Sequence, residues 1–162
     1  MTGDPQGLVE VRIIGLPLAE WAAAQEHVDG LLREFALIGA GREQGLDHHE
    51  PRQLLELVAR IQAEYEGVSA DQEQQLIDAA ESGAQSLDLT YLVPASTALA
   101  CADLGRALDA ADRYCRQGDH LLSLATPPAP LAFRRWYLGE FVAQIGGDAP
   151  TPWPEWVSTQ PS

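Results

Sequence analysis

The stretch Leu87–Cys115, LDLTYLVPASTALACADLGRALDAADRYC, decides the fold of this chain. At its start, apolar side chains alternate with Asp88 and Thr90, which is the period-two pattern of a strand with one buried face. Pro94 ends this strand, and Ser96 can cap the helix that follows. Apolar residues then recur at spacings of three and four, at Cys101, Leu104, Leu108, Ala111 and Cys115. The stretch therefore predicts a strand followed directly by a helix, with Asp109 and Asp112 on the solvent face in i,i+4 pairs with Arg113 and Arg116.

The N-terminal part of the chain repeats this plan. Alternation over 8–15 predicts a strand, and helical spacing predicts a helix over about 18–38. Further helices are expected over about 51–66, 70–84 and 128–145, the last with Leu131, Leu138, Phe141, Val142 and Ile145 facing inward. The prediction is an α+β fold, mostly helical, built as two strand–helix halves with about five helices and two strands. The strands either pair beneath a helical layer or pair through their edges with a second subunit.

The length and composition favour one globular domain. The chain has 162 residues and is 46% hydrophobic, which is enough to bury a core. We place the domain at 8–147, with an N-terminal tail at 1–7 and a Pro/Trp-rich C-terminal tail at 148–162. The C-terminal tail is expected to be extended, with Trp153 docked on the domain because a tryptophan side chain is costly to leave in water.

Charge and residue types exclude several functions. The net charge of −14 repels phosphate, so we expect no nucleic-acid binding and no membrane binding. The chain contains no lysine, which removes P-loop and Schiff-base chemistry. Cys101 and Cys115 lie roughly 21 Å apart on one predicted helix, too far for a disulfide. With no signal peptide or membrane span in the sequence, the expected location is the cytoplasm.

One cluster carries metal-ligand residue types, namely His48, His49 and Glu50 after Asp47. Adjacent histidines diverge on a helix or strand, so a shared ion needs a special loop conformation. The cluster is more typical of a polar loop before a helix. We predict no cofactor and no metal and keep these three residues as weak candidates.

The segment Phe133–Phe141, FRRWYLGEF, is the most unusual stretch. Arginine and aromatic side chains are enriched at interfaces, and here they cover nearly the whole helix circumference. One interpretation is a contact helix whose candidate residues are Phe133, Arg134, Arg135, Trp136, Tyr137 and Phe141. The other is a core helix, buried on more than one side, in which the arginines pair with nearby acids.

Several segments resemble a family of uncharacterised actinobacterial proteins found beside or fused to anti-sigma-factor regulators, which are histidine-kinase-like ATPases. The similar segments are Leu31–Ile38, Leu87–Tyr91, Ala125–Pro128, Phe133–Phe141 and Pro152–Trp153. The resemblance spans most of the chain and implies a role in partner-switching signalling, but no catalytic residue. The chain is not such a kinase itself, because it has no asparagine to hold magnesium and no Asp-x-Gly-x-Gly motif.

Three functional hypotheses follow. The first is a non-enzymatic regulatory protein-interaction module whose partner is an anti-sigma-type kinase or its regulator, with homodimerisation as a further option. The second is a small-molecule sensor with a pocket between the helices and the strand pair. The third is a metal-dependent enzyme that uses the 47–50 cluster.

Overall fold

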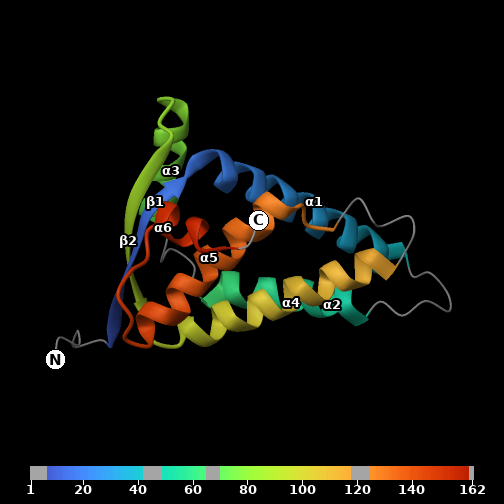
Figure 1. Ribbon diagram of the computed structural model, residues 1–162. Helices are drawn as coiled ribbons and strands as arrows, with labels where there is room; N and C mark the ends of the chain where they lie inside the picture. Colours follow the sequence, from blue (N-terminus) through green and yellow to red (C-terminus); the bar gives the residue numbers. More distant parts are fainter. Residues whose placement is uncertain (1–6, 42–48, 65–69, 118–124, 161–162) are drawn as a thin grey trace.

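The computed structural model describes residues 7–41, 49–64, 70–117 and 125–160. The elements are β1 (Leu8–Pro17), α1 (Leu18–Gly41), α2 (His49–Glu64), α3 (Ala70–Glu81), β2 (Ser86–Pro94), α4 (Thr97–Gln117), α5 (Pro128–Ile145) and α6 (Trp153–Ser158). Figure 1 shows the two strands at one end of the molecule, with α1, α2, α4 and α5 extending away from them. This mostly helical α+β arrangement confirms the predicted fold class.

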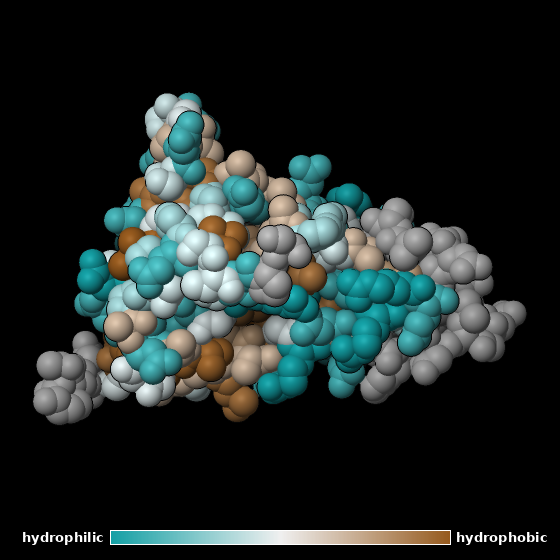
Figure 2. Space-filling model, in the orientation of Figure 1, coloured by the Kyte–Doolittle hydropathy of each residue, from teal (hydrophilic) through white to brown (hydrophobic). Residues whose placement is uncertain are grey.

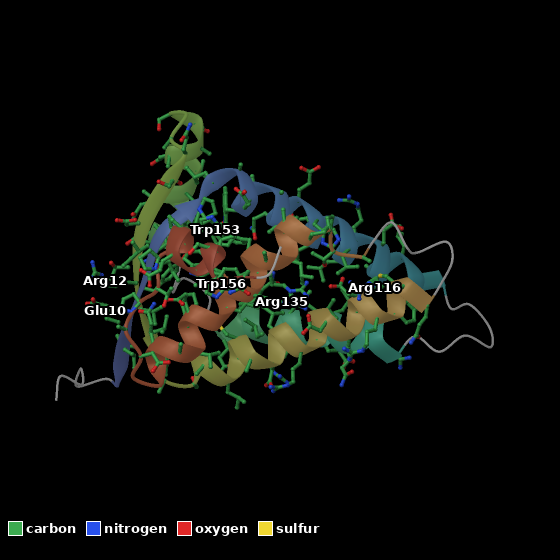
Figure 3. The ribbon with its side chains drawn as sticks, in the orientation of Figure 1. Glu10, Arg12, Arg116, Arg135, Trp153 and Trp156 are labelled. Atoms are coloured by element: carbon green, nitrogen blue, oxygen red, sulfur yellow. The ribbon has the colours of Figure 1, made fainter. Side chains whose placement is uncertain are left out.

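The two strands pair with each other in antiparallel orientation. Of the two arrangements expected from the sequence, this is pairing within one chain rather than with a second subunit. Val11 lies opposite Tyr91 and Ile13 opposite Leu89, and these side chains are buried against the helices. On the other face Glu10 and Arg12 are exposed and point away from the helices (Figure 3). The sheet therefore has one apolar and one wet face, as its alternating sequence requires.

Glutamine side chains satisfy polar groups on both edges of this small sheet. The side-chain amide of Gln144 accepts from the main-chain N–H of Arg12 and donates to its carbonyl, both at 2.8 Å. On the other edge the amide of Gln72 donates to the carbonyl of Thr90 at 2.6 Å. Edge strands left open invite pairing with another chain. At these positions α5 and α3 occupy the edges instead.

The buried apolar side chains form two clusters. One lies between the sheet and α5 and includes Ile13, Tyr91 and Trp136. The other joins α1, α2 and α4, with Phe35, Leu54, Leu108, Ala111 and Cys115 among its members. Helix α5 touches α1, α4 and β1, so it lies at the centre of the fold.

The C-terminal segment differs from the extended tail that we expected. Pro152 precedes α6, and a proline at the start of a helix matches the helical backbone conformation. Trp153 docks as predicted, with its ring 5.4 Å from that of Trp136. The N–H of Trp136 also donates to the carbonyl of Thr151 at 2.9 Å. These contacts attach α6 to the core through α5.

Several helix boundaries also differ from the sequence prediction, and α1 runs to Gly41 rather than to about 38. Helix α2 begins at His49 rather than Pro51. Helix α3 ends at Glu81, and the chain turns at Gly83, whose φ of 81° favours glycine. Among the helices that the structure describes, none combines the length and apolar character needed to cross a bilayer.

Candidate functional site

The six predicted contact residues of α5 differ in how deeply they are buried. Phe133, Arg134, Trp136 and Phe141 are buried, and Tyr137 is half-buried. Only Arg135 is exposed, on the side of α5 shown in Figure 3. Because α5 crosses the centre of the fold, the four buried side chains cannot form an exposed docking face. Their burial favours the other interpretation of this segment, a core helix, and a contact surface at Arg135 and the half-buried Tyr137 stays a prediction.

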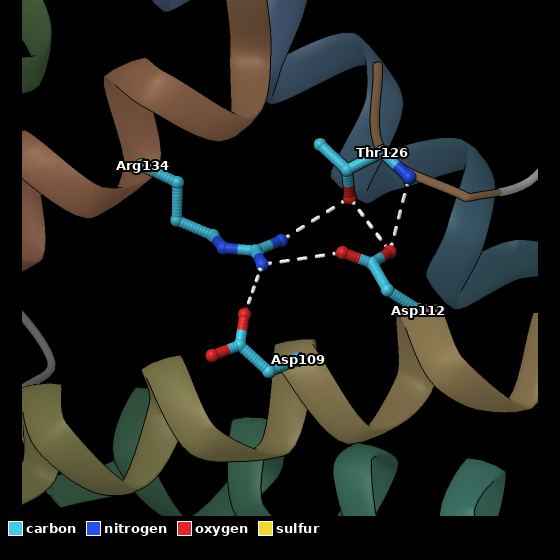
Figure 4. A network of polar contacts seen from close by, with 4 residues as sticks. All are labelled: Asp109, Asp112, Thr126 and Arg134. Carbon is cyan, nitrogen blue, oxygen red and sulfur yellow. Dashed lines mark hydrogen bonds and ion pairs between the residues drawn. The ribbon is translucent and has the colours of Figure 1, made fainter. Parts of the chain in front are cut away.

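A buried polar network joins α4 to α5, and Figure 4 shows its four residues. The guanidinium of Arg134 donates to Asp109 at 2.7 Å and to Asp112 at 3.2 Å. Asp112 also accepts from the hydroxyl of Thr126 at 2.8 Å and from its main-chain N–H at 3.0 Å. Arg134 in turn donates to the Thr126 hydroxyl at 3.2 Å. Each of the four residues is thus bonded to at least one of the others.

This network corrects the prediction that Asp109 and Asp112 form i,i+4 pairs on the solvent face of α4. Asp112 is buried, and its partners come from Thr126 and α5. The sequence contained a signal for the burial of Asp112, because this residue follows Leu108 by four positions and therefore lies beside the apolar stripe of the helix. Figure 2 shows a hydrophilic surface over the C-terminal half of α4, the part of the helix in which Arg113 and Arg116 are exposed.

Beside the network lies a cavity of about 270 Å³, which we call the helix cavity. Helices α1, α2, α4 and α5 form its walls, and Thr126 and Arg134 lie at one side. Its apolar lining consists mainly of Ala24, Val28, Leu32, Val58, Leu104, Leu108, Phe133 and Leu138. A concave, mostly apolar site with a few converging polar groups is typical of small-molecule binding.

A second cavity of about 200 Å³, the strand cavity, lies between β2, α4 and α5. It shares Leu104, Tyr137 and Leu138 with the helix cavity, so the two adjoin. Its lining also includes Tyr91 and Thr97. The hydroxyls of Tyr91 and Tyr137 are hydrogen-bonded to each other at 2.9 Å.

The two cysteine thiols and the hydroxyls of Tyr91 and Tyr137 keep their protons near pH 7, because their pKa values are raised. Burial raises the pKa of Cys101 to about 12 and that of Cys115 to about 11. Burial is also the largest cause of the raised pKa values of Tyr91 and Tyr137. A protonated thiol is a poor nucleophile.

The side chains of the three weak metal candidates lie outside the described part of the chain. His48 lies outside the described residues, and α2 begins at His49, so the surroundings of the His48, His49 and Glu50 side chains are not part of the description. Within the described ranges, no three His, Cys, Asp or Glu side chains gather in the way a metal ion needs.

Comparisons of this chain with family models, curated proteins and solved structures find no match. The resemblance to the actinobacterial family stays a prediction. The functional argument below uses the geometry of the chain itself.

Proposed function

We propose that this chain is a non-enzymatic domain that binds a small, largely apolar molecule in the helix cavity. The observation that carries the proposal is the cavity itself, about 270 Å³ of space with mostly apolar walls from α1, α2, α4 and α5. The helix cavity is partly open to solvent, so a ligand that fills it removes its apolar walls from water. This is the second of the three hypotheses from the sequence.

The size of the helix cavity sets the size of the molecule. An apolar cavity of about 150 Å³ holds benzene. The helix cavity, at about 270 Å³, therefore suits a body the size of two fused rings or a branched chain of similar bulk. A ligand of that kind buries enough apolar surface for micromolar affinity without strong polar contacts.

The electrostatics of the wall favour a neutral ligand. Arg134 lines the helix cavity together with His27 and Asp29, and both Asp109 and Asp112 already accept hydrogen bonds from Arg134. An anionic ligand placed there competes with two carboxylates for one guanidinium. Transfer of an unpaired charge into such a site costs several kcal/mol.

The protonation states next to the cavities support binding without chemistry. The Cys101 thiol, with its pKa raised to about 12, and the Tyr137 hydroxyl, with its pKa raised well above normal, keep their protons at neutral pH. General acid–base catalysis works best with a pKa near the working pH. In the partner-switching setting that the resemblance implies, such a domain would pass ligand binding on to a protein partner.

The test uses two substitutions at adjacent positions of α1. Ala24→Phe places a ring in the helix cavity, whereas Ala23→Phe places the same ring on the exposed face. Binding of naphthalene to each purified chain is measured by ligand-observed NMR and by thermal shift. We expect binding to the unchanged chain and to Ala23→Phe, and at least about a tenfold loss in Ala24→Phe.

At about 100 times the dissociation constant, bound naphthalene should stabilise the fold by about 2.7 kcal/mol. Failure of naphthalene and of similar two-ring or branched neutral probes to bind the unchanged chain would refute the proposal. Undiminished binding to Ala24→Phe would show that the ligand lies elsewhere, which also refutes it.

A further inference from the structure

We infer that the strand cavity receives a neutral hydrogen-bonding group of the ligand, a hydroxyl or a carbonyl, and that the hydroxyl of Thr97 binds this group. The inference rests on the proposed function, because it takes the apolar body of the same ligand to lie in the helix cavity. It assigns a chemical class to the ligand, namely a neutral alcohol, phenol or ketone on an apolar frame.

The first observation is the state of the Thr97 side chain. Thr97 is only 7% exposed and lines the strand cavity. Its hydroxyl has no hydrogen-bond partner among the described residues. Folded proteins rarely leave a buried hydroxyl unpaired, because its lost hydration is not replaced. Valine has nearly the same shape without this cost, so a hydroxyl here indicates a bond to something that enters the cavity.

The second observation is the pair of tyrosine hydroxyls in the same lining. Tyr91 and Tyr137 share one hydrogen bond of 2.9 Å, which uses one of their two hydroxyl protons. The other proton and the unused lone pairs can serve a ligand group. The strand cavity therefore combines apolar walls with donors and acceptors from β2, α4 and α5.

The position of the strand cavity relative to the helix cavity allows one ligand to use both. They adjoin at Leu104, Tyr137 and Leu138. A molecule whose rings fill the helix cavity can therefore extend a short polar substituent past these side chains. The volumes fit this division, with about 270 Å³ for the body and about 200 Å³ for the substituent and its surroundings.

The charge near the strand cavity selects a neutral group over an acid. Burial is the main cause of the raised pKa values of Tyr91 and Tyr137, and the Glu73 carboxylate adds a smaller contribution to both, so its negative charge acts on this region. Among the described residues, the lining of the strand cavity contains no arginine or histidine. A ligand carboxylate would lose its hydration without gaining a cation, whereas a hydroxyl or carbonyl can pair with Thr97.

Three probes with the same rings separate these possibilities: naphthalene, 2-naphthol and 2-naphthoate. Their dissociation constants are measured by calorimetry or ligand-observed NMR on the unchanged chain, on Thr97→Val and on Thr90→Val. Thr90 is an exposed strand residue, so its substitution controls for the chemical change alone.

For the unchanged chain and Thr90→Val we expect 2-naphthol to bind about fivefold more tightly than naphthalene and at least about tenfold more tightly than 2-naphthoate. In Thr97→Val the preference for 2-naphthol over naphthalene should fall to about twofold or less, with the naphthalene affinity unchanged.

The outcomes distinguish the two proposals. If naphthalene binds but 2-naphthol gains nothing, or if Thr97→Val keeps the full preference, the inference about the strand cavity is wrong and the proposed function stands. Equal or tighter binding of 2-naphthoate also overturns the inference. If none of the three probes binds the unchanged chain, both proposals fail.

Discussion

Replacement of Asp112 by asparagine tests whether the polar network holds α4 and α5 together. The side chain of Asp112 is 3% exposed, and its carboxylate accepts three hydrogen bonds, two from Thr126 and one from Arg134. Asparagine has almost the same shape, so the substitution removes the charge and one acceptor while leaving the packing intact. Its carbonyl can still accept from Thr126, but its NH₂ group then faces the guanidinium, donor against donor.

The magnitude follows from what remains around Arg134. Removal of one partner from a buried ion pair costs about 3–5 kcal/mol. Here Arg134 keeps Asp109 at 2.7 Å, which offsets part of the loss. We therefore expect Asp112→Asn to lower the free energy of unfolding by about 2–4 kcal/mol. A domain of this kind has about 5–15 kcal/mol in total, so the variant should still fold.

Asp109→Asn is the matched control, because it makes the same change three residues earlier on α4 and also faces Arg134. The Asp109 side chain is 44% exposed, so water screens its ion pair. Exposed pairs of this kind contribute at most about 1 kcal/mol. Urea unfolding, followed by circular dichroism and tryptophan fluorescence, gives both free energies, and equal slopes against urea would show that the two variants unfold to similar states.

The reasoning is refuted if the two substitutions cost the same, or if Asp109→Asn costs more. Either result would mean that the burial of Asp112 does not govern the strength of its contacts. A double substitution of Asp112→Leu with Arg134→Met extends the test. Because it removes both charges together, we expect it to cost less than the sum of the two single substitutions.

Three further predictions concern the sheet, α6 and a buried thiol. Gly15→Ala should lower the free energy of unfolding by about 1 kcal/mol more than Gly83→Ala. Both glycines have a positive φ, so both substitutions strain the backbone, but only a Cβ added at Gly15 meets another side chain, that of Pro154 at 3.1 Å. Gln144→Leu should cost about 2 kcal/mol by removing two hydrogen bonds to the β1 main chain, as urea unfolding measures. Burial raises the pKa of Cys101 from 9.0 to about 12, so above pH 9 the folded chain keeps a proton that the unfolded chain releases. The stability that this thiol contributes is therefore complete below pH 9 and falls as the pH rises toward 12.

Each of these predictions has its own control. Equal losses for Gly15→Ala and Gly83→Ala would show that α6 does not press on β1. The exposed Gln75→Leu should change the free energy of unfolding little, and a loss equal to that of Gln144→Leu would contradict the role of the edge hydrogen bonds. For Cys101, the stability of the unchanged chain relative to Cys101→Ala should fall between about pH 9 and pH 10.5; a constant difference would count against the raised pKa.

The sequence was sufficient for the elements whose pattern is local. Alternation identified β1 and β2, and the seam through Leu108, Ala111 and Cys115 identified α4 and its buried side. Periodicity was less useful for α5. We expected Val142 to face inward, but it is 38% exposed, whereas the polar Glu140 and Gln144 are buried. Apolar spacing cannot reveal a face whose polar groups find partners on distant elements.

Those partners lie far away in sequence, which is why the candidate site was not predictable in detail. Gln144 bonds to the main chain of Arg12, 132 positions earlier, and Arg134 bonds to Asp112, 22 positions earlier. Only the completed fold brings such groups together. The sequence predicted a pocket between the helices and the strand pair, whereas only the strand cavity, and not the helix cavity, has lining residues from a strand. Nothing local in the sequence pointed to Thr97 or Thr126.

The way this fold treats its buried polar groups gives Thr97 its significance. Buried Asp112, Arg134 and Glu140 all have hydrogen-bond partners. Within the described residues, only two buried side-chain polar atoms lack one, the Oε1 of Gln72 and the hydroxyl of Thr97. Gln72 still bonds to β2 through its other amide atom, whereas the single hydroxyl of Thr97 has nothing and lines a cavity. A chain that satisfies even a buried arginine with three partners has the means to pair one hydroxyl, so the exception is better explained by a ligand than by poor packing.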